Sequence, residues 1–279
     1  MPQVIDAHQH FWRVTAQDQP WRTAHHDAIA RDFEPADLEA ELRTAGVDAT
    51  VLMQSVDEPA ENDRLARYAE DVVVAGVVGW LPLRNPADAR AELQRLRIPN
   101  LVGARCLVAD DPLDWLGEPD VVALFRDLAA KGLTWDVVPI SPAQIGNVLT
   151  LAETVPDLRI VIDHLGRPPV DSRGWEPWAN NVERLASAPG ISMKVSVGID
   201  VLSAWDAWNG DDLHRYVEHA VRAFGSSRLM LASNWPVVVL RASYVQAWRD
   251  LSAAVASCLG DDGYDAVRGE NAKRIYQLP

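Results

Sequence analysis

The stretch Val4-Ile5-Asp6-Ala7-His8-Gln9-His10 combines a carboxylate with two imidazoles at a spacing of two residues. Successive side chains of a β-strand point to opposite faces, so a strand here would place Asp6, His8 and His10 on one face. Two imidazoles that converge can bind a metal ion or donate hydrogen bonds to a substrate. The pattern also fits a strand with one merely polar face, because a short His-x-His motif is weak by itself.

Length and composition restrict the classes of protein to consider. The 279 residues fit a single (β/α)8 barrel, which takes about 250 residues. Acidic residues outnumber basic ones by 40 to 26, and the net charge of −14 opposes binding to nucleic acid or to an anionic membrane. There is no apolar run of about 20 residues that could span a bilayer. Cys106 and Cys258 are far apart, which predicts neither a disulfide framework nor a thiolate metal site and favours the cytoplasm.

Apolar segments rich in Val, Ile and Leu alternate with segments of helical periodicity along the whole chain. The predicted strands span residues 4–10, 49–56, 72–83, 101–108, 133–138, 159–165, 191–197 and 228–233. The predicted helices span residues 35–46, 59–71, 86–97, 119–131, 142–154, 178–188, 212–224 and 242–259. Eight alternating pairs predict an α/β fold, a (β/α)8 TIM barrel forming a single domain over residues 1–279. An open doubly wound sheet is the alternative, but no Gly-x-Gly-x-x-Gly follows the first strand.

A long connection, residues 11–33, follows the first predicted strand. Connections of this length in compact domains are usually functional or disordered. Trp12 and Trp21 favour an ordered, lid-like loop, and His25 in the same loop is a candidate for contact with a substrate.

Barrel enzymes place their active sites at the C-terminal ends of the strands. The side chains predicted there are His8, His10, Gln54, Ser55, Trp80, Arg105, Asp163, His164, Lys194, Ser196, Ser233 and Asn234. Lys194 alternates with apolar neighbours and is predicted to face the barrel interior, where it must meet an anion unless its ammonium reaches solvent at the rim.

Most of the 11 tryptophans lie at predicted strand ends or in the loops that follow them, among them Trp12, Trp80 and Trp235. Flat aromatic side chains around the mouth of a pocket suit a ring-shaped ligand with an apolar face. The alternative is that they only pack the loops onto the barrel.

Six motifs occur in order along the chain: Val-Ile-Asp-Ala-His-Gln-His-Phe-Trp at residues 4–12, Gly79-Trp80, and the segments 161–168, 193–196, 233–236 and 271–276. Together they resemble the amidohydrolase-related lactonases, especially sugar-lactone hydrolases similar to L-fuconolactonase and 2-pyrone-4,6-dicarboxylate lactonase. The resemblance spans essentially the whole chain. It implies a (β/α)8 barrel that hydrolyses a small lactone, most closely a sugar lactone, to the hydroxy acid in carbohydrate metabolism.

The resemblance also implies roles for particular residues. His8, His10 and His164 would contact a metal ion or the lactone carbonyl, and Arg105 and Lys194 would hold substrate oxygens. The other residues expected to bind substrate are Trp12, Trp80, Gln54, Trp235 and His25. Two alternatives stay open for the cofactor, a single divalent ion such as zinc or a site without metal, because residues 135–139 lack the histidine that metal-dependent amidohydrolases usually supply from strand five.

Asn234 departs from the family pattern. The family has Ser-Asp-Trp-Pro after strand eight, and this chain has Ser233-Asn234-Trp235-Pro236. Asparagine cannot accept a proton at neutral pH, and loss of a general base costs roughly 3 to 5 kcal/mol of barrier. Three explanations are open: an inactivating substitution in an active enzyme, a change compensated by another carboxylate such as Asp163 or Asp6, or a chain that binds without catalysis.

Two other functions compete with lactone hydrolysis. One is the metal-dependent decarboxylation of an aromatic acid, which relatives with this barrel perform. The other is non-catalytic binding of a sugar acid. In each case the expected partner is a small molecule, and the sequence leaves a homo-oligomer open.

Overall fold

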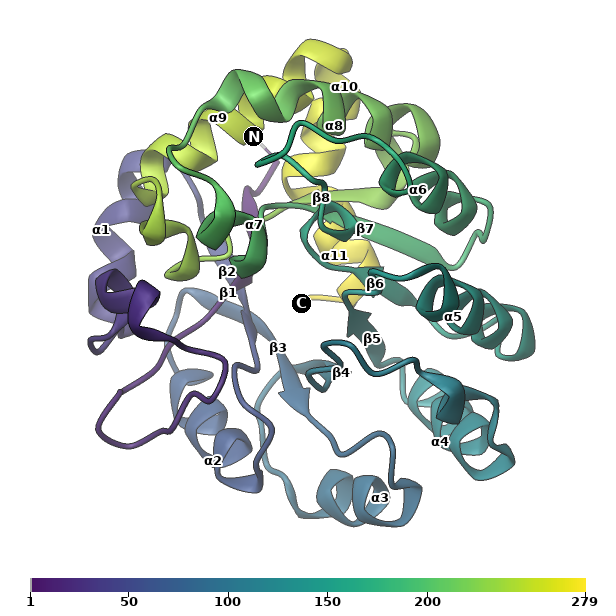
Figure 1. The fold of residues 1–279 in the computed structure, drawn as a ribbon. Helices are drawn as coiled ribbons and strands as arrows, with labels where there is room; N and C mark the ends of the chain where they lie inside the picture. The colour runs from purple at the N-terminus through teal and green to yellow at the C-terminus, as the bar shows by residue number, and fades with distance from the viewer. Residues whose placement is uncertain (1) are drawn as a thin grey trace.

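The computed structural model describes residues 2–279, which form a barrel of parallel strands inside a ring of helices (Figure 1). The strands are β1 Ile5–Gln9, β2 Ala49–Met53, β3 Val74–Trp80, β4 Leu101–Arg105, β5 Thr134–Val137, β6 Ile160–Ile162, β7 Ile191–Val195 and β8 Leu229–Leu231. They pair in chain order from β1 to β8. A bridge between Gln9 and Trp235, with the backbone N–H of His10 donating to Trp235 O at 2.8 Å, joins β8 to β1. The predicted (β/α)8 barrel is confirmed.

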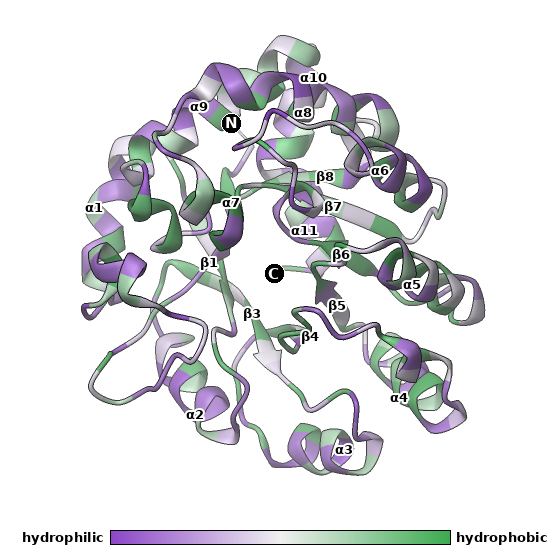
Figure 2. Ribbon diagram, in the orientation of Figure 1, coloured by the Kyte–Doolittle hydropathy of each residue, from purple (hydrophilic) through white to green (hydrophobic). Residues whose placement is uncertain are grey.

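Eight helices correspond to the predicted ones, with ends shifted by a few residues. They are α1 Pro35–Ala45, α2 Pro59–Tyr68, α3 Pro86–Arg95, α4 Pro119–Ala130, α5 Pro142–Thr154, α6 Trp178–Ala186, α8 Gly210–Phe224 and α9 Tyr244–Cys258. The first five begin at proline, which suits a first helical position because its φ is preset and no N–H is needed there. Helices such as α4 and α5 carry both hydrophobic and hydrophilic residues, in keeping with one face packed on the strands (Figure 2).

Several short elements were not predicted. Among them are the 3₁₀ helix 24–29 in the first long loop, and the helices α7 Ile199–Ala204, α10 Asp261–Asp265 and α11 Asn271–Tyr276. Each is too short to show a clear helical period in the sequence. None of the helices within residues 2–279 has the length and hydropathy needed to cross a membrane.

The first strand departs from regular alternation. Asp6 pairs with Thr50 and Gln9 pairs with Leu52. Between these pairs β1 advances by three residues and β2 by two, so β1 contains a β-bulge. Because of the bulge Asp6 faces the helix layer, where its carboxylate accepts from Ser233 Oγ at 2.6 Å and Tyr244 Oη at 3.2 Å. The prediction that Asp6 shares a face with the two histidines is therefore wrong. Asp6 also does not line the cleft in which it might have replaced a missing base.

The barrel interior is closed by α11 at the N-terminal ends of the strands (Figure 1). Ile275 and Tyr276 of α11 are buried in one cluster with apolar side chains of the strands. The strand residues of this cluster are Ile5, Ala7, Ala49, Val51, Met53, Val78, Val102, Val161 and Met230, and Ala232 follows directly after β8. The interior is thus a packed core, and its lower end is built by residues far along the chain.

Gly269, just before α11, allows this helix to approach the first strand. A Cβ at this position would lie 1.8 Å from Gln3 O. No other residue type therefore fits without movement of the backbone, and the segment that leads into α11 is held against the residues that precede β1.

Ile275→Ala tests the contribution of α11 to stability. Because Ile275 is buried in the barrel interior, we expect the free energy of unfolding to fall by about 2–5 kcal/mol. Val72→Ala is the control, since this side chain is 92% exposed and should change stability by less than about 0.5 kcal/mol. Urea unfolding followed by tryptophan fluorescence measures both. Equal unfolding midpoints for the two variants would show that α11 does not close the core.

Candidate active site

A cleft of about 320 Å³ opens at the C-terminal ends of the strands. Its walls come from the strand ends and loops of β1, β2, β4, β5, β6, β7 and β8. The polar residues that line it are His10, Ser55, Arg105, Asp110, His164, Arg167, Asp200 and Asn234. Apolar contributions come from Trp21, Leu107, Val108, Ala109, Val138, Ile199 and Val237. The structure thus brings His10, Arg105, His164 and Asn234 together at one cleft, although they lie far apart in the sequence.

His8 and His10 come from the end of β1 and nearly touch through their ring nitrogens. His8 Nε2 lies 3.1 Å from His10 Nε2, and His10 Nδ1 lies 3.0 Å from Met53 O. A carbonyl only accepts, so His10 Nδ1 carries the proton and its Nε2 keeps a free lone pair. That lone pair points toward His8 Nε2, which either donates a hydrogen bond to it or binds the same cation.

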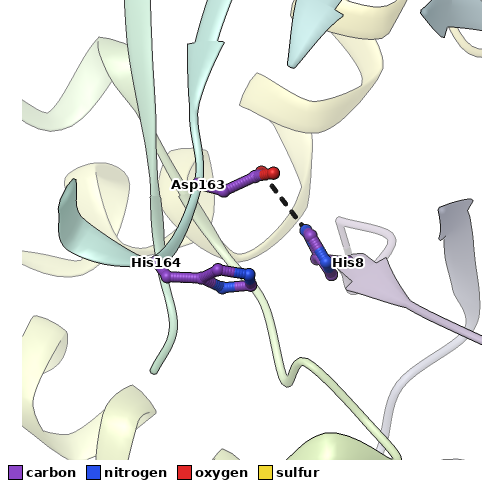
Figure 3. Close-up of side chains that lie close together, drawn as sticks. All are labelled: His8, Asp163 and His164. Carbon is purple, nitrogen blue, oxygen red and sulfur yellow. Dashed lines mark hydrogen bonds and ion pairs between the residues drawn. The ribbon is translucent and has the colours of Figure 1, made fainter. Parts of the chain in front are cut away.

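His164 follows β6, and its ring points toward His8 (Figure 3). Its ring centroid lies 4.5 Å from that of His8, and its Nδ1 is 2.9 Å from Ser196 Oγ. The backbone from His164 to Arg167 has four successive positive φ angles of 56°, 52°, 64° and 58°. Left-handed conformations are unfavourable for residues other than glycine and are found at functional sites, where surrounding contacts hold them.

All three imidazoles are neutral at pH 7. Burial lowers the pKa of His10 and of His164 to about 3, with the positive charge of Arg105 adding to the effect at both. Burial and the nearby Lys194 ammonium lower the pKa of His8 well below its usual value. Neutral imidazoles retain a lone pair, so they can bind a cation or accept a proton.

Lys194 lies beneath the cleft and does not reach solvent. Its Nζ is 2.8 Å from Asp136 Oδ2, 3.0 Å from Asp163 Oδ1 and 3.1 Å from His8 Nδ1, and its side chain is fully buried. The interpretation that its ammonium reaches the rim is wrong, and the prediction that it faces the interior and meets an anion is confirmed. In the described part of the chain Lys194, His8 and Asp163 are all outside the cleft lining, and His8 connects them to it by contacting His10 and His164.

Arg105 and Asp163 join Lys194 and Asp136 in a group of charged side chains beneath the cleft, which we call the floor of the site. Arg105 Nε lies 3.4 Å from Asp163 Oδ2, and Arg105 Nη1 donates to Gln54 O at 3.1 Å. Burial would raise the pKa of Asp163, but Lys194, His8 and Arg105 together hold it well below its usual value. Asp163 is therefore a fixed anion and a poor proton acceptor, which argues against its replacing the base absent at position 234.

Asp136 and Tyr276 belong to the floor but were not predicted from the sequence. Asp136 Oδ2 accepts from Tyr276 Oη at 2.5 Å, and Asp136 Oδ1 accepts from Thr134 Oγ1 at 2.9 Å. An aspartate between Trp135 and Val137 in a mostly apolar strand was a usable signal for Asp136. Nothing in the sequence pattern indicated Tyr276, since α11 itself was not predicted.

Asn234 lines the cleft in a left-handed backbone conformation with φ of 58°. Asn and Asp adopt this conformation more readily than other residues with a Cβ. Its backbone N–H donates to His8 O at 2.9 Å and its Nδ2 donates to Val197 O at 2.8 Å. An aspartate in the same pose would have to be protonated to make the second bond, so the amide fits this environment well.

The tryptophans mostly pack loops onto the barrel. Trp21 is the tryptophan that lines the cleft in the described part of the chain, and its Nε1 donates to Ser55 O at 2.8 Å. Trp12 and Trp235 are buried and pack edge-on against Phe33. Among the other residues predicted to bind substrate, the buried Trp80 and Gln54 and the exposed His25 are outside the cleft lining.

The loop 11–33 is tied to the barrel by side-chain hydrogen bonds. Gln17 Nε2 donates to Ser55 Oγ at 2.7 Å and to the buried Glu61 at 2.9 Å. His26 Nε2 lies 2.8 Å from Ser203 Oγ of α7. Glu61 also accepts from the backbone N–H of Ser55 at 2.7 Å, so this unpredicted carboxylate holds in place the residue to which Trp21 is bonded.

One group of side chains at this site fits a divalent ion. Ligand atoms of His8, Asp163 and His164 lie within 4.8 Å of one another. The 3.1 Å between the Nε2 atoms of His8 and His10 is close to the roughly 3.3 Å between two imidazole nitrogens on a tetrahedral zinc. Met53 O and Asp163 stand behind the other ring nitrogens, as partners that orient ligating histidines usually do.

The family model described as amidohydrolase matches residues 5–278. The chain belongs to the amidohydrolase family. An L-fucono-1,5-lactonase of Burkholderia ambifaria is 37% identical to this amidohydrolase, over 98% of this chain and 95% of the relative. An L-fucono-1,5-lactonase of Burkholderia multivorans is 32% identical, over 99% and 96% of the two chains. A crystal structure of an amidohydrolase from Burkholderia multivorans with bound zinc is 29% identical, with a TM-score of 0.88 over 99% of this chain and 100% of that one.

The lowered pKa of His164 predicts acid sensitivity of this amidohydrolase. Below pH 6.5 the unfolded chain binds a proton at this residue that the folded chain refuses until about pH 3, so stability falls as the pH drops through this window. In His164→Asn, which can keep the contact with Ser196, we expect the free energy of unfolding to fall less steeply with decreasing pH, by about 1.4 kcal/mol per pH unit.

Urea unfolding between pH 6.5 and 5, with a chelator present, measures the slope. His214→Asn on α8 is the control, since His214 is exposed and outside the site. Equal slopes for wild type and His164→Asn would contradict the assignment of a neutral, buried His164.

Proposed function

We propose that this amidohydrolase hydrolyses a monosaccharide lactone to the corresponding hydroxy acid. The observation that carries the proposal is the group of neutral imidazoles beside Arg105 at the base of the cleft. At about 320 Å³ the cleft is at the lower end of small-molecule sites, which favours a ligand of the size of one sugar ring. The relatives named L-fucono-1,5-lactonase support the same class of substrate.

Arg105 is placed to stabilise negative charge on the substrate. Attack on a lactone carbonyl moves charge onto its oxygen, and fixed donors aimed at that oxygen lower the barrier. Arg105 lines the cleft while Asp163 and Gln54 O hold its guanidinium from behind. It therefore enters the reaction already oriented and with its charge partly balanced.

His8, His10 and His164 would hold a divalent metal ion such as zinc. Bound there, the ion would supply Lewis-acid polarisation of a carbonyl and a lowered pKa for water. The protein's own contribution is orientation, because Met53 O and Asp163 fix the rings of His10 and His8. His164 keeps its Nε2 lone pair toward the cleft when its Nδ1 donates to Ser196 Oγ.

Asn234 orients rather than deprotonates the attacking water in this proposal. Its Nδ2 is engaged with Val197 O, which leaves Oδ1 as the acceptor available to a water in the cleft. An amide oxygen can align a water O–H but cannot take up the proton. Turnover then depends on the other groups of the site, and we expect it to be slow.

A panel of sugar 1,4- and 1,5-lactones, including L-fucono-1,5-lactone, tests the proposed reaction. Ring opening releases acid, so a pH indicator follows it against the spontaneous rate in the same buffer. Arg105→Met is the matched variant, since it keeps the length of the side chain without the charge, and we expect it to lose about 100-fold or more in kcat/KM. Absence of ring opening above background on every lactone, by wild type and by Asn234→Asp alike, would refute the proposal.

Asn234→Asp is expected to raise kcat by about two to four powers of ten, the usual contribution of a general base. Val197 O and burial both oppose a negative charge at this position, so the pKa of the new carboxyl in this variant should be raised. The increase in kcat over wild type should therefore grow as the pH rises from 5 to 8. A pH–rate profile of kcat measures this. Tight binding of a sugar acid without turnover by either protein would instead identify a non-catalytic binder.

Removal of metal is expected to abolish most of the activity and addition of zinc to restore it. Elemental analysis of zinc-loaded, gel-filtered protein should find a single equivalent per chain, which His10→Gln loses and His214→Gln keeps. Full lactonase activity in protein from which a chelator has removed all divalent metal would exclude the metal while leaving the reaction itself intact.

A further inference from the structure

Tyr276 is the one residue of α11 with a polar group directed into the floor of the site. Its side chain is 1% exposed and lies in the interior cluster below the strands. Its hydroxyl donates to Asp136 Oδ2 at 2.5 Å. Burial raises the pKa of Tyr276 well above its usual value, so the hydroxyl remains a donor throughout the working pH range.

Asp136 shares the same oxygen with Lys194. Lys194 Nζ lies 2.8 Å from Asp136 Oδ2, while Oδ1 is occupied by Thr134 Oγ1 at 2.9 Å. Burial raises the pKa of Asp136, which means that its charge is costly and depends on these donors. The hydrogen bond from the tyrosine hydroxyl thus stabilises part of the negative charge on Asp136 Oδ2 and weakens the attraction of this oxygen for the Lys194 ammonium.

Lys194 Nζ lies within hydrogen-bond distance of three groups, of which His8 Nδ1 accepts only in the tautomer protonated at Nε2. An ammonium has three N–H groups, and Asp136 Oδ2, Asp163 Oδ1 and His8 Nδ1 all lie within 3.1 Å of Nζ. A stronger pull by Asp136 must weaken the contacts with Asp163 and His8. These are the two groups that face each other across the floor at 3.2 Å.

We infer that Tyr276 is a positioning residue for the active site, which acts through Asp136 and Lys194 to set the orientation and proton position of His8. The contacts run from α11, at the lower end of the barrel, to an imidazole at its upper end. Without the hydroxyl, Lys194 moves its hydrogen bonding toward Asp136, which favours the His8 tautomer whose Nδ1–H donates to Asp163 Oδ1 over the tautomer whose Nδ1 accepts from Lys194. The kinetic consequence, unlike the structural one, rests on the proposed lactonase function.

Tyr276→Phe tests the inference because it removes only the hydroxyl. The matched control is Tyr216→Phe, since Tyr216 is equally buried on α8 and its hydroxyl donates to Gly174 O at 2.8 Å, outside the floor. Ring ¹⁵N signals of His8, assigned with His8→Gln in protein labelled at histidine, report its tautomer at pH 7 without any need for activity. We expect these signals to shift in Tyr276→Phe and to stay unchanged in Tyr216→Phe.

Unchanged His8 signals in folded Tyr276→Phe would overturn the inference, whatever the outcome for lactone hydrolysis. If this variant does not fold, Asp136→Asn tests the same contacts in the opposite sense, because it weakens the hold on Lys194 with little change in volume and leaves the ammonium to Asp163 and His8 Nδ1. A shift of the His8 signals in Asp136→Asn supports the inference, and its absence overturns it.

Kinetics give a second readout if the protein opens lactones. We expect Tyr276→Phe to lower kcat by about 10-fold, as loss of an outer contact to an active-site histidine usually does, with KM within twofold of wild type. A proportional loss in Tyr216→Phe would indicate a general effect on stability and would overturn the kinetic part.

Discussion

The Lys194 ammonium lies inside the barrel, and the arrangement of the floor follows from the need to balance its charge. An unpaired ammonium in a dry interior is prohibitively unfavourable, so its partners must lie within hydrogen-bond distance. Asp136 and Asp163 supply two carboxylates for the two cations, Lys194 and Arg105. The group is neutral as a whole, which is what allows full burial of charged side chains beneath the cleft.

This balance also determines what the groups above it can do. Asp163 is committed to two cations and keeps its charge, so it orients His8 instead of exchanging protons. The positive charges nearby help to keep His10 and His164 neutral. The floor therefore holds fixed charges, and the residues of the cleft lining next to it are His10, His164, Arg105 and Asn234.

The sequence was sufficient for the architecture and for several of the polar residues that line the cleft. The alternation of apolar segments and helical periods identified all eight strands, and the ends of those strands supplied His10, Arg105, His164 and Asn234. It misplaced Asp6, because a bulge leaves no mark on the pattern of residue types. It also overlooked Tyr276, whose contact with Asp136 joins residues 140 positions apart through a short helix without a clear period. Local patterns report periodicity, whereas these features depend on tertiary packing.

The position of α11 has a consequence for how the protein is made. Residues 271–276 come after all eight strands in the chain, so during translation the barrel emerges from the ribosome while Asp136 still lacks its tyrosine partner. The last segment of the chain to be made therefore completes both the packed lower end of the barrel and the hydrogen bonding of Asp136.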